Sequence, residues 1–133
     1  MLPAMASEKV EFLERIYARW CSGDFSRDPG LPEEFTLDLA PEIPESGVYS
    51  GSEQVAAYMA QFLEPWDPLT ITPQEMTEQG DKVLVKVVQR GIGSSSGADA
   101  AQEMINLWTF DGDTPVRMRV TLDEAAARAE LKG

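Results

Sequence analysis

The most distinctive polar residue is Asn106, which lies between two large apolar side chains on an alternating stretch. Met104, Asn106 and Trp108 are two residues apart, so they share one face if the stretch forms a strand. A buried amide costs about 1–3 kcal/mol unless it is hydrogen-bonded. Asn106 could donate a hydrogen bond to a ligand carbonyl or a developing oxyanion, but it cannot carry a proton. The alternative is a core asparagine that is bonded to the backbone or to water.

Asp38 is the candidate proton carrier. It belongs to the alternating stretch 35–39 and shares a face with Ala40, two residues later. An apolar pocket raises the pKa of a carboxylate toward the working pH, as a general base requires. Leu37 and Leu39 point to the opposite side, so Asp38 could equally lie on the solvated face of its strand.

One further amide and several aromatic side chains are candidates for ligand contact. Gln89 ends a face that otherwise carries valines, and it could bond a ligand or mark the solvated end of the strand. Large aromatic residues form either the walls of a ligand pocket or a packed core. This set comprises Tyr17, Trp20, Trp66 and Trp108, and Met104 extends it on the face of Asn106.

The composition excludes several kinds of chemistry. The sequence has no histidine and a single cysteine, Cys21. This removes Ser-His and Cys-His nucleophile pairs, cysteine-rich metal sites and an internal disulfide. The acidic residues fall in loops and helix caps without the spacing of a metal-binding loop, so we expect neither a metal nor another cofactor.

The charge balance narrows the choice of partners. The chain has 23 acidic and 11 basic residues, which gives a net charge of −12. Nucleic acid and anionic membranes both require clustered Lys and Arg, so neither is an expected partner. No run approaches the about 20 apolar residues of a membrane span, and residues 1–9 lack the features of a secretory signal. We therefore expect a cytoplasmic protein.

The elements that position these residues can be read from periodicity and end signals. Ser7 is the expected N-cap of a first helix that ends before Gly23. Residues 50–53 resemble a capping box that opens a second helix, and residues 40–48 are expected to form a loop. From residue 69 the apolar period becomes two. The expected strands cover residues 35–39, 69–78, 82–92, 100–110 and 116–122, and a last helix covers 123–131.

Helices that precede a meander of long strands indicate an α+β fold, an antiparallel sheet with helices on one face. The stretch 104–110 carries bulk on both of its faces, so the outer face would be exposed on a monomer. We therefore expect a homodimer that buries this outer face. Its central residues would be Leu84, Val88, Ile105 and Leu107.

Several segments together carry a family resemblance that spans nearly the whole chain. They are residues 10–17 with Gly23-Asp24, and residues 47–51, 80–83, 106–110 and 116–119. With the element order, they resemble the SnoaL-like branch of the nuclear-transport-factor-2-like superfamily. That superfamily includes ketosteroid isomerases, scytalone dehydratase, polyketide cyclases and limonene epoxide hydrolase. The resemblance implies one domain over residues 1–133, with a cone-shaped curved sheet wrapped around the N-terminal helices.

The same resemblance implies an internal apolar pocket and bears on its chemistry. It places Asn106 where the ketosteroid isomerases keep a protonated, oxyanion-stabilising aspartate. Their basic aspartate, which precedes a proline, corresponds to Ala40 here, and their first-helix tyrosine corresponds to Ile16, one position before Tyr17. Steroid isomerase chemistry is therefore not expected.

We expect a binding protein for a small hydrophobic ligand that contains a ring or a carbonyl, without efficient acid/base catalysis. An amide in place of a titratable residue removes a proton carrier. Two alternatives stay open. A cofactor-independent cyclase, isomerase or dehydratase would polarise a carbonyl with Asn106 and use Asp38 as the base, and a homodimeric protein-interaction module would use the outer sheet face.

Overall fold

A computed structural model describes residues 7–26, 28 and 30–133. The first helix, α1 (Glu8–Trp20), begins as expected, since the Ser7 side chain accepts a hydrogen bond from the Val10 N–H at 3.2 Å. The absence of a secretory signal was predicted from residues 1–9, and residues 1–6 of this segment lie outside the described part. Within that part, no helix is long and apolar enough to cross a membrane.

The second helix differs from the prediction at its start. α2 (Ser52–Leu63) has Gly51 as its N-cap, and no side chain caps it. The predicted capping box at residues 50–53 is wrong because Ser50 ends a strand, β2 (Gly47–Ser50), whose first two residues were expected to belong to a loop. Ser50 pairs with Thr36 of β1 (Thr36–Leu39). Its N–H donates to the Gln54 side chain, and not to the Glu53 side chain that the capping box would require.

Six strands form one curved sheet in the order β2-β1-β6-β5-β4-β3. Its long part is an antiparallel meander, as expected, while β1 pairs with β6 in parallel. The sheet is therefore mixed, and the prediction of a wholly antiparallel sheet is wrong at this one pairing. The meander strands are β3 (Trp66–Gln79), β4 (Lys82–Gly93), β5 (Asp99–Asp111) and β6 (Thr114–Thr121).

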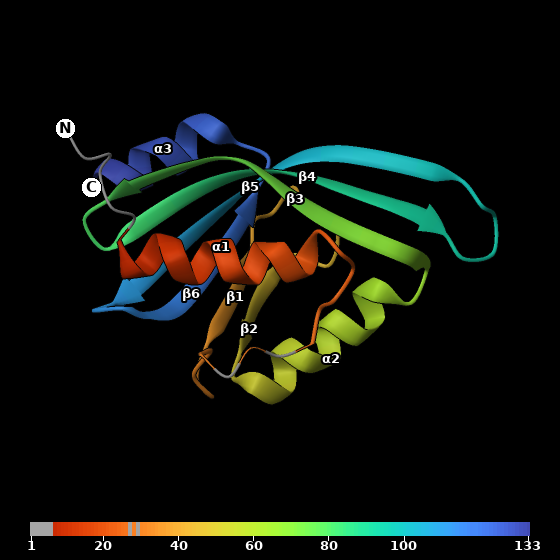
Figure 1. Cartoon of the computed structure of the whole chain (residues 1–133), viewed down its shortest axis with the longest axis horizontal. Coiled ribbons are helices and arrows are strands. Elements are labelled where there is room, and N and C mark those ends of the chain that lie inside the picture. Colours follow the sequence, from red (N-terminus) through yellow and green to blue (C-terminus); the bar gives the residue numbers. More distant parts are fainter. Residues whose placement is uncertain (1–6, 27, 29) are drawn as a thin grey trace.

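The helices lie on both sides of the sheet (Figure 1). α1 and α2 face the concave side, where the main apolar core lies, and α3 (Glu124–Lys132) packs on the other side against β4 and β5. The α+β class is confirmed, but the expectation that all helices share one face is wrong, because the Ala-rich last helix folds back over the convex side.

This position of α3 corrects the argument for a homodimer. Leu84, Ile105 and Leu107 were expected to be exposed on a monomer, but they form a second core with Ala127 and Leu131 of α3. Val88, the fourth expected interface residue, is half-buried. The homodimer itself stays a prediction, but Leu84, Ile105 and Leu107 cannot be the centre of its interface while α3 covers them.

Candidate functional site

A hydrogen-bonded node joins α1 to the concave face of β5. Asn106 Nδ2 donates to the Tyr17 hydroxyl at 2.7 Å, and Trp108 Nε1 donates to the same oxygen at 2.9 Å. The pleat of β5 brings both residues to one face, as the alternation predicted, and α1 places Tyr17 against them. Tyr17 is fully buried, and burial raises the pKa of its hydroxyl despite the opposing effect of the two hydrogen bonds.

The node lies beside a narrow hollow of about 70 Å³ on the concave face. Its walls include Leu37, Leu39, Ile71, Val87 and Met118, together with α2 side chains. Of the described residues that line it, the polar ones are Tyr58, Gln89 and Asn106. The narrow hollow is smaller than the about 300–1,000 Å³ of most small-molecule sites, but its lining, an apolar surface with a few hydrogen-bonding groups, is of the kind that such sites have.

Two larger hollows adjoin the narrow one. The apolar hollow, of about 340 Å³, lies between α1, α2 and β1, and shares Trp20, Phe25 and Met59 with the narrow hollow. The acidic hollow, of about 550 Å³, is named for Glu42 and Glu45 in its wall. It shares Ile43, Tyr58, Phe62, Gln89 and Met104 with the narrow hollow.

These hollows divide the predicted ligand-contacting residues among them. Trp20, Gln89, Met104 and Asn106 line the narrow hollow together. Trp108 lines the apolar hollow with Trp20, while Trp66 lines the acidic hollow with Gln89 and Met104. Tyr17 lines none of these three hollows, but it contacts residues that do, through the hydrogen bonds of its hydroxyl and through the contacts of its ring with Trp20 and Trp108.

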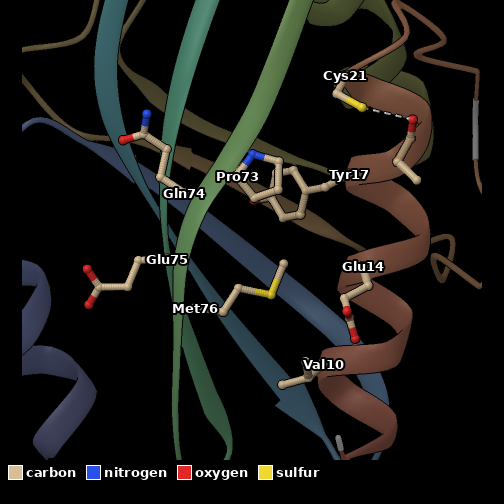
Figure 2. A pocket seen from close by; sticks show the side chains of 9 residues that line it. Val10, Glu14, Tyr17, Cys21, Pro73, Gln74, Glu75 and Met76 are labelled. Carbon is tan, nitrogen blue, oxygen red and sulfur yellow. Dashed lines mark hydrogen bonds between the residues drawn. The ribbon is translucent and has the colours of Figure 1, made fainter.

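A separate groove of about 460 Å³ runs between α1 and β3 on the other side of Tyr17 (Figure 2). Tyr17 extends across it toward Pro73, with Val10 and Glu14 along the helix. The free thiol of Cys21 lines one end and donates to the Ala18 carbonyl at 3.2 Å. Tyr17 thus separates this groove from the node's two donors.

The structure contradicts the prediction that Asp38 faces the pocket. Leu37 and Leu39 line the hollows, so alternation turns Asp38 to the convex face. There the carboxylate accepts from Arg117 and from Arg119, the latter at 2.8 Å. Burial alone would raise the pKa of Asp38, but the hydrogen bonds and charges of both arginines outweigh it and lower this pKa. Asp38 is therefore a buried partner of two arginines and not a base in the pocket.

A second buried carboxylate, Asp28, was missed from the sequence. It lines the apolar hollow and is 2% exposed. It accepts from the Gly30 N–H at 2.7 Å and pairs with Arg15 at 3.3 Å and Arg19 at 3.0 Å. Burial raises the pKa of Asp28, but these bonds and charges prevail and lower it. Its turn-rich segment has no periodicity that could have indicated this burial.

Tyr58 is the other residue whose role the sequence did not show. Its position on the apolar face of α2 indicated only a core side chain, and it is 9% exposed. Its hydroxyl has no hydrogen-bond partner among the described residues. Across the same residues every fully enclosed polar side-chain atom has a partner. The Tyr58 hydroxyl must therefore face the narrow and acidic hollows, which Tyr58 lines.

Metal binding has no support in the described part of the chain, where no three Cys, Asp or Glu side chains are grouped to hold an ion. The carboxylates of the site region are instead spread over different walls. Asp28 lies at the apolar hollow, and Glu42 and Glu45 lie at the acidic hollow.

The fold has solved relatives at low sequence identity. A SnoaL-like polyketide cyclase candidate from Jannaschia sp. CCS1 has a TM-score of 0.75 at 19% identity, covering 100% of this chain and 97% of its own. TerC, co-crystallised with polyporic acid, has a TM-score of 0.73 at 22% identity, covering 94% of this chain and 98% of its own. A ketosteroid isomerase-like protein from Catenulispora acidiphila DSM 44928, in complex with trimethylamine, has a TM-score of 0.68 at 16% identity and covers 91% and 92%.

These structures show that the fold is shared, while the family follows from the sequence itself. The comparison with curated proteins gives no match. The model of the SnoaL-like domain matches residues 13–118, which include most of α1, all of α2 and the strand β5 that carries Asn106 and Trp108. The chain therefore belongs to the SnoaL-like domain family.

Proposed function

We propose that this protein binds a small, largely apolar molecule that carries a carbonyl or a ring, and that it does so without efficient acid/base catalysis. The observation that carries the proposal is the node of Tyr17, Asn106 and Trp108 beside an apolar hollow. The described lining of the narrow hollow includes no Asp, Glu, Lys, Arg or Cys. A ligand there would find hydrogen bonds and apolar contact, but no group that exchanges protons readily near neutral pH.

Hydrogen-bond accounting indicates which end of Asn106 faces the ligand. The Trp108 indole can only donate, so it occupies one lone pair of the Tyr17 oxygen. While Asn106 Nδ2 donates to the other, the Tyr17 proton has no acceptor among the described residues. Turning the amide about its last torsion keeps the contact, lets Tyr17 donate to Oδ1 and directs Nδ2 toward the narrow hollow. We infer that a ligand carbonyl selects this turned amide, because the Trp108 N–H, the Tyr17 hydroxyl and the Asn106 amide then each donate to an acceptor.

Two of the structural neighbours support small-molecule binding in this fold. TerC was crystallised with polyporic acid and the Catenulispora acidiphila protein with trimethylamine, two chemically different molecules. The fold thus accommodates different ligands, and the residues of each hollow decide which one binds.

The cyclase, isomerase or dehydratase alternative loses its proposed base. Asp38 lies on the convex face, and Asp28, which does line the apolar hollow, already accepts three hydrogen bonds. A carboxylate held in this way has a lowered pKa and is a weak base. The interaction-module alternative also weakens, because α3 covers the apolar outer face on which it depended.

A matched pair of probes tests the proposal. We would titrate the protein with 2-acetylnaphthalene and with 2-isopropenylnaphthalene, which replaces the carbonyl oxygen by a methylene group, and follow tryptophan fluorescence. One net hydrogen bond predicts a preference for the ketone of about fivefold. Asn106→Leu should bind both probes with equal affinity, since it keeps the shape but lacks the donor. Failure of both probes to bind, or a ketone preference that survives in Asn106→Leu, would refute the proposed function.

A further inference from the structure

The acidic hollow is a built cavity that the proposed function does not use. Its described lining combines three aromatic side chains with two carboxylates and contains neither Lys nor Arg. α2 supplies Tyr58 and Phe62, the start of β3 supplies Trp66, and the segment after β1 supplies Glu42 and Glu45. Because the narrow hollow shares part of this lining, one elongated ligand can reach both.

Tyr58 points to a ligand at this place. Its side chain is more than nine-tenths buried, yet its hydroxyl has no hydrogen-bond partner among the described residues and must face the two hollows. Burial, reinforced by nearby Tyr49 and Glu45, raises the pKa of Tyr58 to about 12, so the hydroxyl is neutral at physiological pH. A ligand group that enters the hollows could therefore form a hydrogen bond with this hydroxyl.

The two carboxylates of the acidic hollow differ in what they already bind. Glu42 accepts hydrogen bonds from the Thr121 hydroxyl and from the Leu122 N–H. Glu45 has neither an ion pair nor a side-chain hydrogen bond within the part of the chain that the structure describes. Its backbone adopts a φ of 64°, and its carbonyl accepts from the Tyr49 hydroxyl at 2.7 Å, which fixes the residue at the rim. The negative charge of Glu45 is therefore available to a ligand.

The aromatic faces beside this charge favour a cation. Tyr58 and Phe62 stack with ring centroids 5.8 Å apart, and Trp66 lines the same hollow. Aromatic faces attract alkylammonium groups, and a carboxylate adds to that attraction. The net charge of −12 raises the local concentration of cations further and repels anions.

We propose that the acidic hollow is a subsite for a tertiary or quaternary ammonium group, held by Glu45, Tyr58 and the faces of Phe62 and Trp66. The subsite extends the proposed function, since the apolar part of the same ligand occupies the narrow hollow. A ligand with an amine at one end and a carbonyl or ring at the other would fit both places.

The test compares benzyltrimethylammonium with neopentylbenzene, its uncharged carbon isostere, by titration calorimetry at low and constant salt. We expect the native protein to bind the ammonium probe at least about fivefold more tightly. Glu45→Gln should reduce this preference to less than about twofold, because it removes the charge that faces the probe. Tyr58→Phe should leave the preference nearly unchanged, since a quaternary ammonium has no N–H to donate to the Tyr58 hydroxyl. The same variant should weaken the binding of a tertiary probe, N,N-dimethylbenzylammonium, several-fold. Glu103→Gln is the matched control, because it removes the same charge from a β5 residue next to Met104 that lines none of the hollows. It should keep the preference of the native protein.

Three results would overturn the subsite. They are equal affinity for the two probes, no binding of either, and an equal loss of preference in Glu103→Gln and Glu45→Gln, which would indicate the overall charge alone. The naphthyl ketone titration separates the two proposals. Ketone binding that is unaffected by Glu45→Gln, without an ammonium preference, refutes the subsite and leaves the proposed function standing. An ammonium preference without ketone binding refutes the proposed function.

Discussion

Replacing Tyr17 by phenylalanine removes one oxygen atom and leaves two donors without an acceptor. The Asn106 amide and the Trp108 indole both donate to that oxygen, and the two side chains are 4% and 1% exposed. The ring itself stays, so its edge-to-face contacts with Trp20 and Trp108 are retained. The substitution therefore tests the hydrogen bonds of the node separately from its packing.

The expected cost follows from the number of unpaired donors. Each buried group left without a partner costs about 1–3 kcal/mol. The Asn106 amide borders the narrow hollow and can turn toward it, while the Trp108 N–H has no such outlet, so we expect a total of about 2–4 kcal/mol. For a domain of this size, this corresponds to a melting temperature lower by roughly 10 °C.

Urea unfolding of native and variant proteins measures this cost, and an unchanged m-value shows that both lose the same structure. Tyr49→Phe is the control, because the Tyr49 hydroxyl makes one exposed bond, to the Glu45 carbonyl, and its loss should cost less than about 1 kcal/mol. In an Asn106→Leu background, Tyr17→Phe should cost about 1 kcal/mol less than in the native protein, since one donor is already gone. A Tyr17→Phe variant as stable as the Tyr49→Phe control would refute the node as a buried hydrogen-bonded unit.

Three further predictions follow from the core and the ion pairs. The pKa of Asp38 is lower in the folded protein than its value of about 4 in the unfolded chain. The carboxylate therefore stabilises the fold fully at pH values above about 4, and this stabilisation is lost as the pH falls through the pKa of the folded state. Asp38→Asn should therefore lower the free energy of unfolding by about 1–3 kcal/mol at pH 7, and this difference should vanish in acid. The variant should bind the ketone as tightly as the native protein; a loss of ketone affinity would show that Asp38 belongs to the binding site. Leu131→Ala should cost about 2–4 kcal/mol and promote self-association in size-exclusion chromatography, because it uncovers the convex core beneath α3; an unaltered elution volume and stability would show that α3 contributes little. Trp108→Ala should cost about 3–5 kcal/mol in urea unfolding, since the ring is 1% exposed and contacts Phe12, Tyr17, Trp20 and Phe35; a cost below about 1 kcal/mol would mean that it is only the wall of an open cavity.

Local periodicity was enough to predict most elements and the face of Asn106. The pleat of a strand places every second side chain on one side, so the spacing of Met104, Asn106 and Trp108 already put them together. Short Gly-bearing turns between long strands likewise required an antiparallel meander. These inferences hold because the signal and the structure lie within one element or between neighbours in sequence.

The residues that were misjudged depend on contacts between distant segments. Alternation showed that Asp38 and its leucine neighbours lie on opposite faces of the strand, but not which face is buried. The parallel pairing of β1 with β6 places Arg119 beside Asp38 on the convex face. Nothing in the last helix indicated which side of the sheet it covers, and its fold-back removed the exposed apolar face from which a dimer was expected.

The sequence by itself determined the class of fold, the family and the shared face of Met104, Asn106 and Trp108, because these follow from periodicity and the order of elements. Only the tertiary structure decided that Tyr17 joins Asn106 and Trp108, that Asp28 is a buried carboxylate and that the Tyr58 hydroxyl opens to a hollow. The physical reason is that periodicity fixes the face of a side chain within its own element. Its partners and its electrostatic surroundings are fixed by segments that meet only when the chain has folded.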